Sequence, residues 1–421
     1  MASDIHAAID AVWRIESARL IAGLARMTRD VGMAEDLAQD ALVAAIEQWP
    51  ESGIPNNPGA WLMATAKHRA IDQFRRNTRL QTKQELLGRE MAVEQDLSQP
   101  DLEEAMDEDD YGDDLLRLIF TACHPVLAME ARVALTLRLL GGLTTDEIAR
   151  AFLVPEATLA QRIVRAKRTL SEAHVPFEVP QGPERVERLA SVLEVIYLVF
   201  NEGYSATAGS DWVRPALCED ALRLGRILAG LATDEPEVHG LVALMELQAS
   251  RLRARTDASG KPVLLPNQDR GKWDRLLIQR GLAGLERAQN LGGALGPYGL
   301  QAAIAACHAR ARTADETDWE RIAALYDALS QVTPSPVVEL NRAVAVSMAF
   351  GPAAGLEIVD ELASEPSLKS YHHLPSVRGD FLFRLGRLEE ARTEFERAAS
   401  LTRNESERTL LLERAQACAH P

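Results

Sequence analysis

Lysine and arginine residues gather in two stretches of this chain, and the chemistry that such clusters offer is the binding of phosphate groups. Residues 58–83 contain six basic residues and one acidic residue, and residues 132–170 contain seven basic and three acidic residues. Between them, residues 84–114 hold thirteen acidic residues and one arginine. The net charge of −16 alone argues against a nucleic-acid partner. Its distribution instead predicts two phosphate-binding patches joined by a solvated acidic segment.

Residues suited to covalent chemistry are scattered along the chain. Glu202 and Asp269 have carboxylates that could form an acid/base pair, but no spacing brings them together. We expect instead that Asp269 or Asp274 forms a buried ion pair, with Arg251 or Arg255 as its partner. The sequence contains no nucleophile, metal or phosphate-loop signature, so we predict that the protein is not an enzyme and needs no cofactor.

The cysteines indicate neither a disulfide framework nor a metal site. Cys123, Cys218, Cys307 and Cys418 lie about a hundred residues apart and none belongs to a CxxC motif. Cys123 precedes His124, but this pair supplies only two ligands. We therefore predict buried thiols and no metal.

The elements that carry the basic patches are expected to be helices. Apolar residues make up 47 % and aromatic residues 5 % of the 421 residues, which favours packed helices over sheets. We predict an all-α fold. There is no run of 18 apolar residues and no basic segment followed by an apolar run at the N-terminus, so we expect no membrane partner and a cytoplasmic location.

An amphipathic helix is predicted for residues 34–49. Its apolar face is expected to pack; it comprises Leu37, Ala41, Leu42, Ala45, Ile46 and Trp49. Its polar face is expected to be free for a partner; it comprises Glu35, Asp36, Gln39, Asp40 and Glu47. Prolines, glycine and asparagines at 50–59 should end this helix. The next helix should bury Leu62, Ala66, Ala70 and Phe74 and project Lys67, Arg69, Arg75, Arg76 and Arg79.

A helix-turn-helix is predicted within residues 132–170. Thr144 and Glu147 have the spacing of a capping box at the start of a short helix, which should bury Ile148, Ala149 and Phe152. Pro155 suits the first turn of a second helix. That helix should bury Leu159, Ile163, Ala166 and Leu170 and expose its polar residues, Lys167 among them. A basic second helix of this kind enters the major groove of DNA.

The motifs AEDLAQD at 34–40, AWL at 60–62 and RAIDQFRR at 69–76 resemble region 2 of extracytoplasmic-function sigma factors. The resemblance implies that the acidic helix docks on the β′ clamp helices of core RNA polymerase through Asp36, Gln39 and Asp40. It also implies that the basic helix meets the −10 promoter element. The residues so implied are His68, Arg69, Asp72, Arg75 and Arg76. Alone, the basic helix would more readily be interpreted as a solvated face of i,i+3 and i,i+4 ion pairs.

The helix-turn-helix resembles region 4 of the same family, through GGLTTDEIA at 141–149 and PEATLAQRIVRA at 155–166. Region 4 reads the −35 element and contacts the polymerase β flap. The resemblance makes Glu156, Gln161 and Arg165 candidates for base edges, and Thr158, Arg162 and Arg168 candidates for phosphates. The acidic segment is either the family's linker through polymerase or a spacer that keeps the chain in solution.

The predicted domains are a region 2-like module at 1–80, an acidic linker at 81–110, a region 4-like module at 111–178 and a helical extension at 179–421. Small and aromatic residues near the end match the offsets of a tetratricopeptide repeat; they are Gly379, Gly386, Ala391, Phe395 and Ala398. The whole chain resembles the sigma factors that carry such an extension. The resemblance implies that the extension regulates activity by contacting the sigma modules or polymerase.

The chain is therefore interpreted as a sigma factor that binds core RNA polymerase and promoter DNA and promotes transcription initiation. The alternative is a helix-turn-helix regulator whose helical domain senses a ligand or protein. Such a regulator would bind promoter DNA without polymerase, whereas a sigma factor needs the core enzyme.

Overall fold

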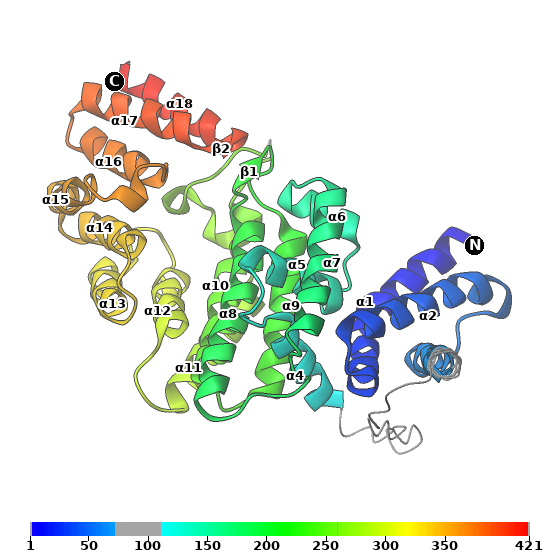
Figure 1. The fold of residues 1–421 in the computed structure, drawn as a ribbon. Helices are drawn as coiled ribbons and strands as arrows, with labels where there is room; N and C mark the ends of the chain where they lie inside the picture. The colour runs from blue at the N-terminus through cyan, green and yellow to red at the C-terminus, as the bar shows by residue number, and fades with distance from the viewer. Residues whose placement is uncertain (1, 72–110, 259, 420–421) are drawn as a thin grey trace, which may run out of the picture. The chain divides into compact units, whose positions relative to one another are not determined.

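A computed structural model describes residues 2–71, 111–258 and 260–419 of the chain. The predicted all-α fold is confirmed: nearly all regular structure in these residues is helical (Figure 1). The exceptions are two short strands, β1 (Ala208–Gly209) and β2 (Arg403–Asn404), which pair in parallel. The chain divides into two compact units, residues 1–195 and 196–421, and the division falls within one helix. The predicted linker at 81–110 lies outside the described residues.

The first unit consists of two helical modules packed on each other. Its elements are α1 (Ala2–Thr28), α2 (Val31–Ser52), a helix at 58–71, α4 (Tyr111–Ala122), α5 (Met129–Leu139), α6 (Thr145–Phe152), α7 (Glu156–Glu172) and the first half of α8 (Gly182–Tyr204). Helices α1 and α2 form an antiparallel pair, and α4 packs on α1. Asp30 begins α2, because its side chain accepts a hydrogen bond from the Met33 amide.

The prediction that the turn begins at Pro50 is wrong by three residues. Helix α2 includes Pro50 and ends after Ser52. Proline lacks an amide hydrogen, so Pro50 cannot donate the helical hydrogen bond to the Ile46 carbonyl. Ile46 is 40 % exposed, so this turn of the helix lies at the surface. Gly53 then ends the helix with a φ of 81°, a conformation that glycine adopts readily. The exposure of Ile46 also corrects its predicted place on the packed face.

The first half of α8 is fixed to the second module of this unit by buried polar contacts. The Arg188 guanidinium donates to the Phe120 carbonyl at 2.9 Å, and the Ser191 hydroxyl donates to the Cys123 carbonyl at 2.7 Å. Arg132 of α5 donates in turn to the Ser191 hydroxyl at 3.0 Å. Residues 182–195 therefore complete the module that α4 and α5 begin.

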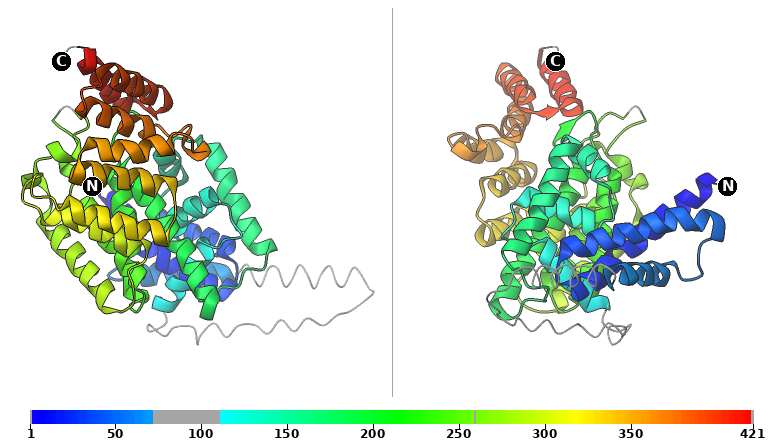
Figure 2. Two further views of the ribbon diagram at one scale, coloured as in Figure 1. Left: turned by 90° about the vertical axis from the view of Figure 1, so that its left-hand side faces the viewer. Right: turned by 45° about the vertical axis from the view of Figure 1, so that its right-hand side comes forward.

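The second unit is a succession of helices in which neighbours along the chain pack on one another. It continues α8 and adds α9 (Pro215–Leu231), α10 (Pro236–Ala249), α11 (Arg275–Asn290), α12 (Pro297–Arg310), α13 (Trp319–Val332), α14 (Pro336–Phe350), α15 (Pro352–Leu362), α16 (His373–Arg384), α17 (Leu388–Leu401) and α18 (Glu405–Ala419). Short 3-10 turns lie at Leu252–Ala254, Leu265–Asn267, Arg270–Lys272 and Pro366–Leu368. Helices α12 to α18 follow one another in a curved row, which Figure 2 shows from two further sides.

The helix pair predicted near the end of the chain is present as α16 and α17. Ala391, Phe395 and Ala398 are fully buried between them. Gly379 allows the close approach, because a Cβ atom at this position would lie 2.9 Å from the Phe395 ring. Gly386 turns the chain between the helices with a φ of 76°. These small and aromatic residues therefore pack two consecutive helices closely, and the assignment of a tetratricopeptide repeat stays a prediction.

Another glycine-containing segment forms the corner before α12. Gly296 precedes α12, and Glu237 of α10 accepts hydrogen bonds there from the amides of Tyr298 and Gly299. A Cβ on Gly296 would lie 2.5 Å from the Glu237 side chain, so this contact needs glycine. Further along, buried Asn404 donates to the carbonyls of Ala206 and Asp211, which anchors β1 to β2.

Candidate nucleic-acid and polymerase interface

The predicted helix-turn-helix is formed by α6 and α7. The capping box at Thr144 is confirmed: its hydroxyl accepts from the Glu147 amide at 3.1 Å, and the Glu147 carboxylate accepts from the Thr144 amide at 2.8 Å. Leu153 adopts a left-handed conformation with a φ of 52°, which turns the chain between the helices. Pro155 is the N-cap residue of α7 and so stands one position before the helix.

The outer face of α7 carries the residues predicted to contact DNA. Its inner face buries Leu159, Ile163, Ala166 and Leu170 as predicted. Five of the six side chains predicted to meet the −35 element are exposed: Glu156, Thr158, Gln161, Arg165 and Arg168. Arg162 is half-buried, and Arg168 pairs with Glu172 at 2.6 Å. This face can therefore meet a polyanion without rearrangement of the helix.

The basic helix at 58–71 lies against α2. Leu62, Ala66 and Ala70 are buried as predicted, and Trp61 packs edge-on against Trp49 of α2, with ring centroids 5.3 Å apart. His68 is exposed and Arg69 is half-buried. Asp72, Arg75 and Arg76, which were predicted to meet the −10 element, lie outside the described residues, as does Phe74.

All three predicted polymerase-binding residues already have partners within the unit, and the Gln39 side-chain amide donates to the Glu35 carboxylate at 2.5 Å. Asp36 and Asp40 are exposed on α2, and Gln39 is half-buried. Asp36 pairs with Lys167 of α7 at 3.3 Å, and Asp40 pairs with Arg69 at 3.5 Å. Exposed pairs of this kind are weak and are readily exchanged for contacts with another protein.

Glu35 corrects the prediction that the whole polar face of α2 is free. Its side chain is only 3 % exposed and joins Arg138 of α5, at 2.7 Å, to Lys167 of α7. Burial opposes ionisation of Glu35, but Lys167 and Arg138 outweigh it and hold the pKa of this carboxyl below its usual value. Lys167 was expected on the outer face of α7; it turns inward because the buried carboxylate needs a cationic partner.

Further ion pairs connect the two modules of this unit. Arg26 of α1 contacts Asp114 of α4 at 3.1 Å, and Arg14 of α1 contacts Glu147 of α6 at 2.8 Å. Sequence periodicity could not reveal these contacts, because it indicates which residues share a helical face and not which helix covers that face.

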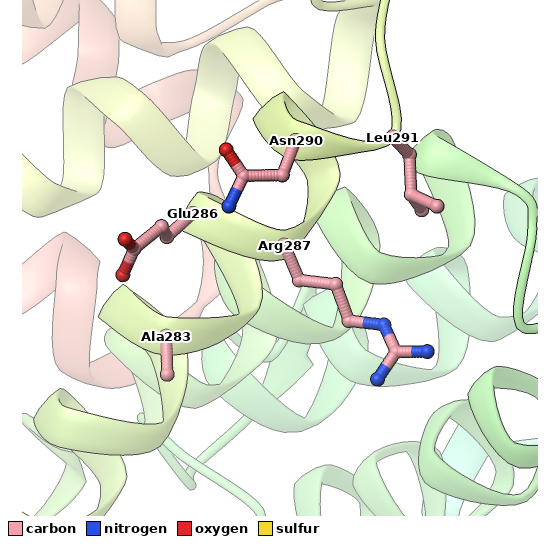
Figure 3. Close-up of a pocket in the computed structure, with 5 residues that line it drawn as sticks. All are labelled: Ala283, Glu286, Arg287, Asn290 and Leu291. Carbon is pink, nitrogen blue, oxygen red and sulfur yellow. The ribbon is translucent and has the colours of Figure 1, made fainter.

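Within the described residues, the remaining candidates for chemistry have structural partners of their own. Glu202 and Asp269, which could have formed an acid/base pair, have separate partners: Glu202 binds Arg214 at 2.5 Å, and Asp269 accepts from the Gly271 amide at 2.8 Å. A surface pocket on α11 is lined by Ala283, Glu286, Arg287, Asn290 and Leu291. In Figure 3 the carboxylate of Glu286 and the guanidinium of Arg287 point apart, so they do not converge on one ligand.

One group of described residues has the composition of a metal site, although no metal site was predicted from the sequence. His372, His373 and Glu407 place their ligand atoms within 4.8 Å of one another. His372 Nε2 lies 2.9 Å from one Glu407 oxygen, and His373 Nδ1 lies 3.8 Å from the other. Spacing rules could not find this group, because Glu407 follows the histidines by more than thirty residues.

Comparison with known families identifies both modules. Residues 15–80 match the family described as sigma-70 region 2, and residues 117–170 match the family described as sigma-70, region 4. The chain is a sigma-70 family sigma factor. Such a factor acts in promoter recognition and transcription initiation, and its family implies interaction with core RNA polymerase and promoter DNA.

The rest of the sigma factor has no functional description among its matches. Residues 188–289 match a family of unknown function, DUF6596. An uncharacterized protein of Rhizobium meliloti (strain 1021) is 46 % identical over 384 residues, which cover 91 % of this sigma factor and 89 % of that protein. Within the described residues, no helix is long and apolar enough to cross a membrane.

Proposed function

We propose that the protein is an extracytoplasmic-function sigma factor that reads the −35 element with α7 and the −10 element with the basic helix that begins at residue 58. The observation that carries this proposal is the exposed polar face of α7 in a helix-turn-helix whose sequence matches region 4. Glu156, Gln161 and Arg165 would meet base edges. Thr158, Arg162 and Arg168 would meet phosphates, and His68, Arg69, Asp72, Arg75 and Arg76 the −10 element.

On the polymerase side, we assign Asp36, Gln39 and Asp40 of α2 to the β′ clamp helices, and region 4 to the β flap. Support comes from the exposure of Asp36 and Asp40 and from their weak pairing. Binding would exchange the contacts with Lys167 and Arg69 for contacts with cationic groups on polymerase.

Promoter binding would also require the two modules to separate. The −35 and −10 elements lie about 25 base pairs apart, roughly 85 Å along a duplex at about 3.4 Å per base pair. In this structure Lys167 of α7 contacts Asp36, and Arg69 of the basic helix contacts Asp40. Asp36 and Asp40 are one helical turn apart, a rise of about 5.4–6 Å. The two reading helices are thus far too close together to occupy both elements at once.

Multi-round transcription with purified core polymerase tests the proposed function. The template is a promoter taken from upstream of the protein's own gene, and we expect a transcript that needs both core enzyme and this protein. A regulator of the rival kind would instead shift promoter DNA in a gel without core enzyme. Absence of a core-dependent transcript from every candidate promoter would exclude the sigma function.

Arg165 and Arg168 provide a matched pair for base and phosphate contacts. We expect Arg165→Ala to reduce discrimination at one position of the −35 element by about 1–3 kcal/mol, because a base-edge contact is lost. Arg168→Ala should weaken transcription from all −35 variants equally, because a phosphate contact carries no sequence information. Transcription from a set of single-base −35 variants measures both effects. An unchanged preference profile in Arg165→Ala would remove Arg165 from the reading residues.

The extension is proposed to regulate transcription, and the structure specifies where a truncation should fall. Removing everything after residue 180 would also remove Arg188 and Ser191, whose contacts complete the second module. A chain ending after Tyr204 keeps the whole of α8. We expect this truncated chain to retain promoter-specific transcription at an altered level. Identical transcription by the full and truncated chains would show that the extension does not regulate this step.

A further inference from the structure

Three arginines and three aromatic residues alternate in the second unit. The arginines are Arg251, Arg255 and Arg270, and the aromatic residues are Tyr204, Trp212 and Trp273. From the guanidinium carbon to the ring centroid, the distances are 5.5 Å for Arg255 and Trp212, 3.8 Å for Arg255 and Tyr204, 5.8 Å for Arg251 and Tyr204, 5.7 Å for Arg251 and Trp273, and 4.7 Å for Arg270 and Trp273. We call these six residues the arginine ladder.

The arginine ladder lacks the carboxylates that were predicted to neutralise it. Among the described residues, none of its three arginines forms an ion pair with a carboxylate. Asp269 accepts from the Gly271 amide, and Asp274 accepts from the amides at the start of α11. Helix and turn capping thus occupies both acids, and the predicted buried ion pairs with Arg251 or Arg255 are wrong.

The result is an unusual concentration of buried positive charge. Arg251 is 8 % exposed, and an unneutralised buried charge is costly. Burial and then the charge of Arg251 lower the pKa of Arg270. His308, also buried, has its pKa lowered to about 3 by burial and by Arg251 and Arg270, so it stays neutral. The ladder stacks its arginines on rings, which stabilises them without cancelling their charge.

Donor groups of the ladder also lack partners. The Nε atoms of all three arginines and the indole nitrogens of Trp212 and Trp273 are buried and have no hydrogen-bond partner among residues 2–71, 111–258 and 260–419. Such atoms are rare in folded proteins and call for an unseen partner. Arg270 is held in place by the carbonyls of His308 and Ala311. In the described part of the chain, Arg251 has no such carbonyl anchor, and Arg255 has only a hydrogen bond with the Tyr204 side chain. These two arginines are therefore the members of the ladder that can still accept an anionic partner.

We propose that Arg251 and Arg255 bind the oxyanion group, phosphate or carboxylate, of a small molecule. A guanidinium presents parallel N–H groups that match such an oxyanion, and stacking on Tyr204 holds both forks in position. The site is reachable, because Arg255, Tyr204 and Trp212 are only half-buried whereas Arg251 and Trp273 lie beneath. All of these residues fall within the match to the family of unknown function.

An anion bound by Arg251 and Arg255 would lie next to Tyr204 and could therefore act as a signal for the extension. Tyr204 is the last residue of α8, and Arg188 and Ser191 of the same helix contact the region 4 module. Control of transcription by the bound anion would rest on the proposed regulatory function of the extension. Binding of the anion itself does not depend on that function.

Isothermal titration of the full chain tests the site without a transcription assay. The probes are sodium phosphate, sodium pyrophosphate and sodium citrate, each compared with sodium chloride at matched ionic strength. We expect saturable binding of at least one probe at one site per chain, with a rise in the unfolding temperature. Preference for pyrophosphate would assign a phosphate ligand, and preference for citrate a carboxylate ligand. Absence of saturable binding for all three probes would overturn the proposal.

Variants separate a built site from general attraction of anions. Arg255→Gln removes a half-buried member of the ladder and should weaken binding at least about tenfold. Arg253→Gln is the matched control, because Arg253 lies in the 3-10 turn that Arg255 caps and is exposed. Circular dichroism confirms that each variant is folded; Arg251, at the centre of the packing, is left intact. Equal weakening by both substitutions, or none by Arg255→Gln, would show that the ladder only stabilises the fold.

Discussion

Replacing Glu35 with alanine is expected to lower the free energy of unfolding of the first compact unit by about 3–5 kcal/mol. The Glu35 side chain is 3 % exposed and holds Arg138 and Lys167, each 17 % exposed. Without it, Arg138 loses its carboxylate partner, and Lys167 keeps only its weak pair with the exposed Asp36. Urea unfolding, with hydrogen exchange measured in peptides from α2, α5 and α7, reports the loss.

Asp36→Ala is the matched control on the same helix. The Asp36 side chain is 77 % exposed, so its pair with Lys167 should contribute only about 0–1 kcal/mol. The two variants should therefore affect different measurements. Glu35→Ala should lower the stability of the unit, whereas Asp36→Ala should leave stability unchanged and weaken binding to core polymerase. Equal destabilisation by both would mean that Glu35 is not the principal link between the modules.

Acid should have the same effect as removal of Glu35. Burial raises the pKa of this carboxyl, but Lys167 and Arg138 lower it further, so its pKa is below the ordinary value of 4.5. A carboxyl with a lowered pKa stabilises the folded state fully above its unfolded pKa. We expect that contribution to disappear as the pH falls below about 4.5. The difference in unfolding free energy between wild type and Glu35→Ala should shrink over this range; a constant difference would contradict the assignment.

The features that sequence predicted well are those fixed by local contacts. The capping box of Thr144 and Glu147 spans four residues, so its geometry follows from the backbone of one helical turn. The buried face of α7 follows from the repeat of the helix. In both cases, every atom that decides the outcome belongs to a short stretch of the chain.

The features that sequence missed depend on which helix covers which face. Glutamate is usually a surface residue, and Glu35 is buried in an ion pair only because the fold places Arg138, 103 residues away in sequence, beside it. Asp274 illustrates the opposite error, because the amides that begin α11 compete for its carboxylate and are closer in sequence than any arginine. Pairing of charges across a fold therefore cannot be predicted from composition, whereas competition from a nearby helix start can.

Phe395→Ala should produce a large loss of stability in the second unit, about 3–5 kcal/mol of unfolding free energy. The ring is fully buried between α16 and α17 and lies under the Arg414 guanidinium, 4.3 Å from its carbon atom. Phe383→Ala on α16 is the control, because Phe383 is 40 % exposed and should cost less than about 1 kcal/mol. Urea unfolding monitored by hydrogen exchange in α16 and α17 measures both. Similar costs for the two phenylalanines would place the core of this helix pair elsewhere.

The contact between Gly379 and Phe395 decides whether the small residue sets the spacing of these helices. A Cβ atom on residue 379 would lie 2.9 Å from the Phe395 ring, so Gly379→Ala should destabilise the wild-type chain by about 1–3 kcal/mol through overpacking. In Phe395→Ala the ring is absent, and the added methyl group should cost nothing or fill part of the cavity. The double variant should therefore be more stable than the sum of the single effects predicts. If the two effects simply add, the close approach of α16 and α17 is set by other residues, and the match to the tetratricopeptide pattern at this position is coincidental.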